Sequence, residues 1–133
     1  MIFVDTGAWV ARFSRRDQYH DHASVIWAKL KSAQVRIVTS DSVFVETVAL
    51  LTRQLGARPA VEAGRFLKNW QGLTILRALP EDEIAALDLL EKFSDQSVGF
   101  VDCLSFALIR RYHIPAAFSF DRHFDLARVK ILA

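Results

Sequence analysis

Short apolar runs along the chain alternate with longer segments in which apolar residues recur every three or four positions. Uninterrupted apolar runs are typical of strands that are buried on both faces, and the longer spacing is typical of helices that bury one face. We therefore expect strands at residues 2–5, 35–38, 73–76, 116–120 and 129–132. The helices that we expect cover residues 7–14, 19–32, 41–55, 58–70, 80–93 and 99–113.

Glycine and proline mark several of these boundaries. Gly56 follows the third expected helix, and Pro80 with the acids that follow it begins the fifth. No linker of proline, glycine or serine and no internal repeat divides the chain, so we expect residues 1–133 to form one domain. Helices between buried strands predict an α/β fold, a three-layer α/β/α sandwich around a mostly parallel sheet. Ligands of such sheets bind beyond the carboxyl ends of the strands.

Four acidic residues lie within or directly beside the apolar runs. Asp5 and Asp121 close the first and fourth expected strands, and Glu46 and Asp102 lie near the starts of expected helices. A lone buried carboxylate is costly unless it stays protonated, so four acids at such positions suggest a shared cation. Acids around a hard divalent ion are typical of sites that hydrolyse phosphodiester bonds.

Each acid also has an alternative role of its own. Asp5 suits an Asx turn and Asp121 suits the N-cap of a helix. Glu46 and Asp102 suit ion pairs with nearby arginines. For any single acid these roles explain the position as well as a cation does, whereas the four together favour one shared site.

Composition narrows the class of protein. The chain has 133 residues, 52% of them hydrophobic, which excludes disorder and allows a substantial core. We find no apolar stretch of membrane-spanning length and no signal peptide, so we expect a cytoplasmic protein without a membrane partner. Cys103 is the only cysteine, and we expect a buried thiol in a reducing compartment. The net charge of +2 is too small to indicate nucleic acid, and the cluster of Arg12, Arg15 and Arg16 fits either a polyanion or a solvated face.

The four acids lie in four short segments whose order and spacing match a known family. The segments are Ile2-Phe3-Val4-Asp5-Thr6, Thr39-Ser40-Asp41-Ser42-Val43-Phe44-Val45-Glu46, Val98-Gly99-Phe100-Val101-Asp102-Cys103-Leu104 and Ser119-Phe120-Asp121-Arg122-His123-Phe124. On these segments the chain resembles the PIN-domain ribonucleases and, within them, the VapC-type toxins of toxin–antitoxin pairs. The resemblance extends over roughly residues 2–131, and no departure from the family pattern removes a carboxylate.

The resemblance implies an endoribonuclease that depends on Mg²⁺ or Mn²⁺ and hydrolyses RNA phosphodiester bonds. It implies that Asp5, Asp102, Asp121 and Glu46 are both the catalytic residues and the metal ligands. Three neighbours are candidates for substrate binding or for orienting the acids: the hydroxyls of Thr6 and Ser119 and the guanidinium of Arg122. Local turn or cap bonds are the alternative for the hydroxyls, and an ordinary surface position is the alternative for the arginine.

The partners that the resemblance implies are an RNA substrate, a cognate antitoxin protein and a second copy of the chain in a homodimer. Trp9, Phe13 and Trp27 are candidates for an aromatic groove that receives the antitoxin. The same three side chains would serve equally well as ordinary core.

Other readings of the sequence stay open. A non-catalytic PIN-like module that binds RNA or protein would share the fold, although four retained acids argue against it. The tripeptide Asp5-Thr6-Gly7 also occurs in aspartic proteases, but those folds are all-β and need two copies, whereas this chain has one. Nothing in the sequence favours a purely structural subunit.

Overall fold

A central sheet of five strands organises the chain. The computed structural model describes all residues from 1 to 133, and the strand order is β3-β2-β1-β4-β5. Every neighbouring pair is parallel, so the predicted α/β/α sandwich is confirmed, with a sheet that is wholly rather than mostly parallel. The strands are β1 (Ile2–Val4), β2 (Ile37–Ser40), β3 (Leu73–Leu76), β4 (Ala116–Phe118) and β5 (Lys130–Leu132).

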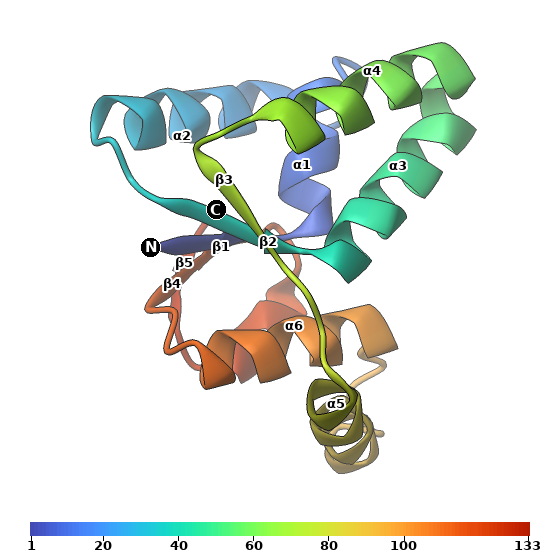
Figure 1. Ribbon diagram of the computed structural model, residues 1–133, viewed down its shortest axis with the longest axis vertical. Coiled ribbons are helices and arrows are strands. Elements are labelled where there is room, and N and C mark those ends of the chain that lie inside the picture. The colour runs from blue at the N-terminus through green and yellow to red at the C-terminus, as the bar shows by residue number, and fades with distance from the viewer.

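Helices cover both faces of this sheet. The first four helices lie on one side, and the last two helices with a short 3-10 helix lie on the other (Figure 1). None of these helices combines the length and the apolar character that crossing a membrane requires. The bounds are α1 (Thr6–Phe13), α2 (His20–Ser32), α3 (Asp41–Leu55), α4 (Ala57–Asn69), α5 (Pro80–Lys92), α6 (Phe100–Arg111) and η1 (Arg122–Ala127).

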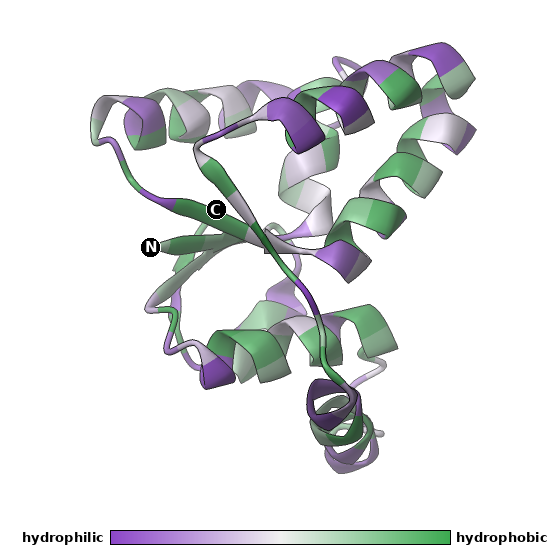
Figure 2. Cartoon of the chain, viewed as in Figure 1, coloured by the Kyte–Doolittle hydropathy of each residue, from purple (hydrophilic) through white to green (hydrophobic).

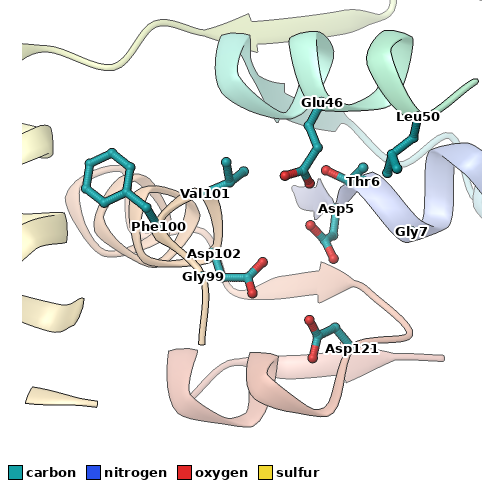
Figure 3. A pocket seen from close by; sticks show the side chains of 10 residues that line it. All are labelled: Asp5, Thr6, Gly7, Glu46, Leu50, Gly99, Phe100, Val101, Asp102 and Asp121. Carbon is teal, nitrogen blue, oxygen red and sulfur yellow. The ribbon is translucent and has the colours of Figure 1, made fainter. Parts of the chain in front are cut away.

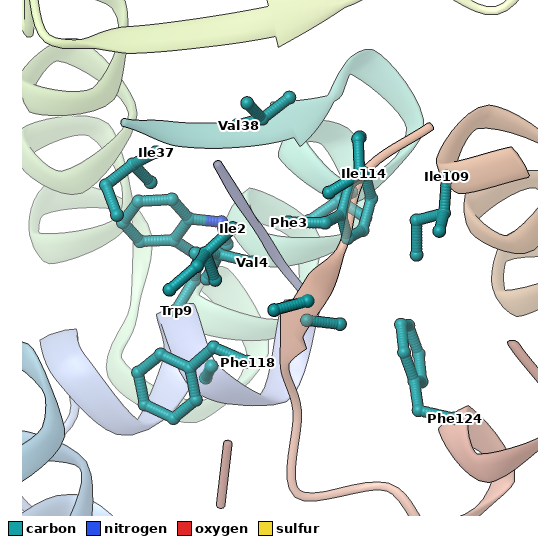
Figure 4. Packing of buried hydrophobic residues seen from close by; sticks show 14 of the residues in the cluster. Ile2, Phe3, Val4, Trp9, Ile37, Val38, Ile109, Ile114, Phe118 and Phe124 are labelled. Atoms are coloured by element: carbon teal, nitrogen blue, oxygen red, sulfur yellow. The ribbon is translucent and has the colours of Figure 1, made fainter. Parts of the chain in front are cut away.

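The central strands are apolar because helices cover both of their faces. Most of β1, β2 and α6 is hydrophobic, whereas α2 and α4 carry hydrophilic stretches (Figure 2). Phe3 of β1 lies beside Ile114 on the side of α6 (Figure 4). Val4 and Phe118 lie on the opposite side with Trp9 of α1. All five side chains are at most 2% exposed, and burying each large one contributes roughly 1.5–3 kcal/mol.

The second strand begins and ends two residues later than the expected 35–38. The N–H of Val35 donates to the carbonyl of Leu30 and so closes the last turn of α2 instead of joining the sheet. Ser40 remains in the strand, and its hydroxyl accepts a hydrogen bond from the N–H of Val43 at 3.1 Å. The strand therefore leads directly into α3 through a serine N-cap.

The fourth strand ends at Phe118, two residues before the expected boundary. The hydroxyl of Ser119 accepts a hydrogen bond from the N–H of Asp121 at 3.0 Å, which turns the chain out of the sheet. Phe120 lies in this turn and packs against the start of α2 through Tyr19. The turn places three consecutive side chains at the carboxyl end of β4.

The order of the strands creates a switch point between β1 and β4. The chain leaves β1 toward β2 on one side and leaves β4 toward β5 on the other, so the two connections diverge. In open parallel sheets the crevice at such a point is where ligands bind. Asp5 directly follows β1 and Asp121 is the third residue after β4, so both predicted acids lie at this crevice.

A buried carboxylate joins α5 to α6. Asp82 is 3% exposed and accepts two hydrogen bonds from Arg111, from Nε to Oδ1 and from Nη2 to Oδ2, each at 2.8 Å. Its Oδ2 also accepts the N–H of Leu79 at 2.8 Å, which caps the first turn of α5. Burial raises the pKa of Asp82, but the bonds from Arg111 and Leu79 outweigh it and hold that pKa below its ordinary value of 3.8.

We expect Asp82→Asn to lower the free energy of unfolding by about 1–3 kcal/mol at pH 7, because it removes charge-assisted bonds to Arg111. The folded-state pKa lies below the unfolded one, so the stabilisation is present above pH 3.8 and is lost as the pH falls through the folded-state pKa. Urea unfolding at several pH values measures the difference. Asp88→Asn, at an exposed position of the same helix, is the control. Equal stability of wild type and Asp82→Asn at pH 7 would contradict the role of this pair.

Candidate active site

One cavity at the carboxyl end of the sheet brings together the four acids that the sequence singles out. Asp5, Glu46, Asp102 and Asp121 all line a space of about 360 Å³. They come from the end of β1, from α3, from α6 and from the turn after β4. Their carboxylates point toward one another across the cavity (Figure 3). The structure thus gathers residues that are up to 116 positions apart, since Asp5 and Asp121 differ by 121 − 5 = 116.

Ser119 connects two of the acids directly. Its hydroxyl donates to Oδ2 of Asp5 at 3.0 Å and accepts the N–H of Asp121 at 3.0 Å. The side chain of Asp5 makes no cap bond to α1, although Asp5 occupies the N-cap position of that helix. Asp5 is thereby free to face the cavity, and its orientation is set by a hydroxyl from the neighbouring strand end.

Asp5 is the most strongly perturbed acid in the site. Burial, together with the charges of Asp102 and Asp121, raises the pKa of Asp5 to about 7. Hydrogen bonds from the backbone of Thr6 and from Ser119 oppose this rise without cancelling it. Without a bound cation the carboxyl would therefore be protonated in a substantial fraction of molecules near neutral pH, because burial and the neighbouring carboxylates disfavour its charged form.

Asp102 shows the same effect to a smaller extent. Burial raises its pKa to about 6, and the charges of Asp121 and Glu46 add to the rise. The backbone at Gly99 and the ring of His123 act in the opposite direction. The two raised pKa values reflect burial together with a local excess of negative charge, which a multivalent cation would offset.

His123 belongs to the site although the sequence analysis did not select it. Its Nδ1 lies 2.7 Å from Oδ1 of Asp121, and its Nε2 lies 2.8 Å from the carbonyl oxygen of Gln96. Both ring nitrogens therefore face oxygens. Ligand atoms of Asp102, Asp121 and His123 all lie within 4.8 Å of one another. His123 lies two residues after Asp121, in the fourth of the segments that match the family, and this position was the available signal in the sequence.

The remaining predicted residues divide into two groups. Thr6 lines the cavity, and its hydroxyl is buried without a hydrogen-bond partner. Arg122 is exposed and does not line the cavity, so the structure does not place it among the acids. The Thr6 hydroxyl is therefore available to a ligand in the cavity, although four other buried side-chain polar atoms of the chain also have no hydrogen-bond partner.

The structure shows only some of the separate roles that the sequence analysis gave as alternatives for the individual acids. Asp121 does cap η1, since its Oδ1 accepts the N–H of His123 at 2.9 Å. No arginine forms an ion pair with Glu46 or Asp102, because the one arginine–carboxylate pair of the structure joins Arg111 to Asp82. The idea that nearby arginines neutralise these two acids is therefore wrong.

The aromatic groove expected from Trp9, Phe13 and Trp27 has a different composition. Trp9 is fully buried, and its Nε1 donates to the hydroxyl of Thr39 at 3.2 Å, so it is a core residue. Trp27 instead lines a cavity of about 790 Å³ between α2 and α4, together with Phe66 and Trp70. The sequence does not separate these cases, because apolar spacing on a helix is the same for core and groove residues.

Comparisons with known proteins support the resemblance seen in the sequence. The PIN domain family matches residues 2–130. The chain is 35% identical over 130 residues to the 23S rRNA-specific endonuclease VapC20 of Mycobacterium tuberculosis, in strains CDC 1551 and H37Rv. This match covers 96% of the chain and 94% of that protein.

Solved structures agree with this assignment. The crystal structure of M. tuberculosis VapC20, described as a toxin that cleaves the sarcin-ricin loop, has a TM-score of 0.85 and 30% identity. This structural match covers 96% of the present chain and 95% of the VapC20 chain. FitAcB from Neisseria gonorrhoeae has a TM-score of 0.73 at 12% identity, with 100% and 97% coverage, and shows the shared fold alone. The chain belongs to the PIN domain family, and its resemblance to VapC-type proteins is confirmed.

Proposed function

We propose that this chain is a metal-dependent endoribonuclease that acts as the toxin of a toxin–antitoxin pair. The observation that carries the proposal is the convergence of four carboxylates, two of them with a raised pKa, in one cavity at the switch point of the sheet. The relative VapC20 is described as an endonuclease for 23S rRNA, which makes ribosomal RNA the first substrate to test.

The donor set fits a hard divalent cation. Carboxylate oxygens are the ligands that Mg²⁺ and Mn²⁺ prefer, and no cysteine lines the cavity. We propose Asp5, Asp102 and Asp121 as the residues that hold the ion, with Glu46 on the facing wall. When bound there, such an ion lowers the pKa of water and stabilises the charge that develops on a scissile phosphate.

The chain's own residues supply orientation and proton transfer. Ser119 fixes the carboxylate of Asp5, and the backbone bond from Asp121 to Ser119 holds the two acids in one frame. We propose that Glu46 orients the attacking water and accepts its proton, since Glu46 faces the other acids across the cavity. The unpartnered hydroxyl of Thr6 lies on the same wall, where we propose that it donates to a phosphate oxygen.

The raised pKa values generate a stability prediction. Because the folded-state pKa of Asp5 is about 7 against an ordinary 3.8, its contribution to stability is full below pH 3.8 and is lost as the pH rises through 7. We expect Asp5→Asn in chelator to be about 1–3 kcal/mol more stable than wild type at pH 8, and the gap to close toward pH 4. Thermal or urea unfolding across this range is the measurement. If Asp5→Asn were less stable than wild type at pH 8, this result would contradict the destabilisation of the ionised Asp5 by its burial and by the neighbouring carboxylates.

Catalysis gives a second test. We expect Asp5→Asn and Asp102→Asn each to lower the rate of RNA cleavage about 100-fold or more, because each removes a proposed ligand of the ion. Excess chelator should stop the wild-type enzyme, and Mg²⁺ or Mn²⁺ should restore it. The assay uses ribosomal RNA and a stem-loop of the sarcin-ricin sequence.

Asp125→Asn is the matched control for the cleavage assay, because Asp125 is an exposed acid of η1 outside the cavity. It should cleave as wild type does. Full activity in Asp5→Asn, or cleavage that persists in chelator, would contradict the assignment. A folded wild type that binds RNA without cutting it would favour the non-catalytic PIN-like module.

We further propose that the cavity between α2 and α4 receives the antitoxin. The guanidinium of Arg12 lies 4.7 Å from the ring centroid of Trp27 and 5.5 Å from that of Trp70. Burial lowers the pKa of Arg12, and no acid lines the cavity, so an apolar segment that carries a carboxylate complements it.

A negative charge introduced into this cavity tests the partner. Phe66→Asp should weaken binding of the protein encoded next to this gene about tenfold or more, since Phe66 is an exposed aromatic of the cavity. Val61→Asp, an equally exposed apolar position on α4 outside the cavity, is the control. Co-purification and calorimetry measure the affinity, and unchanged binding to Phe66→Asp would exclude this surface.

The proposal also includes one domain and a homodimer. Ile84 and Leu87 are exposed and lie one turn apart on α5, which offers an apolar face to a second copy. Sedimentation of the wild type and of Ile84→Lys distinguishes a dimer through this face from a monomer.

A further inference from the structure

An aromatic stack stands directly beside the acidic cavity. Phe120 is the residue between Ser119 and Asp121, and the ring of Tyr19 lies parallel to it, with centroids 4.4 Å apart and 5° between the planes. His22 meets Phe120 edge-on at 6.0 Å. Tyr19 is 40% exposed, so the stack extends from the turn that carries Asp121 out to solvent.

Hydrogen bonds fix the backbone in both segments that carry the stack. On the side of the cavity, the Ser119 hydroxyl fixes the turn that contains Phe120 through its bonds to Asp5 and Asp121. At the outer end, the N–H of Tyr19 donates to Oδ1 of Asp17 at 2.8 Å. The outer ring is thus positioned relative to the acids by hydrogen bonds in both segments, which is the property of a preorganised binding surface.

Phe120 is the one aromatic ring that stacks on Tyr19, and Tyr19 is partly open to solvent. Phe120 covers one face of Tyr19. The hydroxyl of Tyr19 makes no hydrogen bond within the chain. The bond from Tyr19 to the side chain of Asp17 comes from its backbone N–H. A flat apolar face beside a phosphodiester-cleaving cavity suits a nucleobase, since every base has a π-face.

The surrounding charge favours a polyanion. Arg15 and Arg16 are exposed on the loop that leads to Tyr19, and Arg122 is exposed two residues after Phe120. None of these three arginines forms an ion pair with an acid of the chain. Two acids also lie nearby, but Asp17 uses one oxygen for the Tyr19 N–H and Asp21 lies in the first turn of α2. The arginines therefore remain available to phosphates on either side of a stacked base.

We propose that Tyr19, backed by Phe120, is the platform on which an unpaired RNA base stacks next to the scissile phosphate. The inference rests on the proposed ribonuclease function and adds to it a preference for nucleotides that are flipped out of a loop or lie in single-stranded RNA. Sequence-tolerant stacking positions the backbone, while the acids act on the adjacent phosphodiester.

The experiment measures binding separately from cleavage. Wild type, Tyr19→Leu and Tyr19→Trp are titrated in chelator with a fluorescently labelled single-stranded RNA, so that no strand is cut. Tyr19→Leu keeps an apolar side chain against Phe120 but removes the flat face, and it should bind about 5- to 150-fold more weakly. Tyr19→Trp keeps the flat face and should bind within a few-fold of wild type. Tyr112→Leu alters a tyrosine that is 41% exposed at the end of α6 and should bind as wild type does.

Each result decides for or against the platform. Weak binding by Tyr19→Leu alone supports it. Wild-type affinity in Tyr19→Leu, equal losses in Tyr19→Leu and Tyr19→Trp, or an equal loss in Tyr112→Leu overturns it, provided that urea unfolding shows each variant folded. Cleavage of the same RNA by the wild type with Mn²⁺ tests the ribonuclease function independently. The wild type can cleave this RNA even if the binding experiment overturns the platform.

Discussion

The mutual repulsion of four carboxylates at one end of a parallel sheet is the constraint on which the site depends. Burial and neighbouring negative charge bring the pKa of Asp5 to about 7 and that of Asp102 to about 6. Such crowding opposes folding at neutral pH, and the apolar core around Phe3 and Phe118 must offset it. Groups that lower stability in this way and have strongly shifted pKa values are typical of functional sites, because a surface without a function has no need of them.

One turn after β4 connects most of the features of the site. Ser119 binds Asp5, Asp121 faces the cavity and holds His123, and Phe120 carries the aromatic stack. Local hydrogen bonds join Ser119, Asp121 and His123 within this turn, and contacts with Asp5, Tyr19 and Gln96 join the turn to other segments of the chain. The same turn therefore links the proposed metal site to the proposed base platform, and it explains why β4 is shorter than its apolar sequence predicts.

The sequence predicts the architecture well where the signals are local. The helix at 41–55 and the strand at 73–76 have the predicted bounds, because Gly56 and Gly72 end or precede them. The convergence of the acids was predictable as well, since the carboxyl ends of parallel strands meet at one edge of the sheet.

Features that depend on tertiary contacts were not predictable. His123 joins the site through Asp121 and the carbonyl of Gln96, which lies 27 residues away in the chain. Trp9 is core and not groove, because Thr39 from the next strand accepts its indole N–H. In each case a partner from a distant segment of the chain decides the role, and the local sequence does not identify that partner.

Calorimetric titration with Mn²⁺ at pH 6.5, in two buffers of different ionisation enthalpy, tests most directly whether the acids jointly bind a cation. Wild type should bind the ion and release protons, because Asp5 and Asp102 are partly protonated at this pH without it. Asp5→Asn should bind at least about tenfold more weakly and release fewer protons. Absence of Mn²⁺ binding by the wild type, or equal affinity and proton release in Asp5→Asn, would contradict a shared cation site.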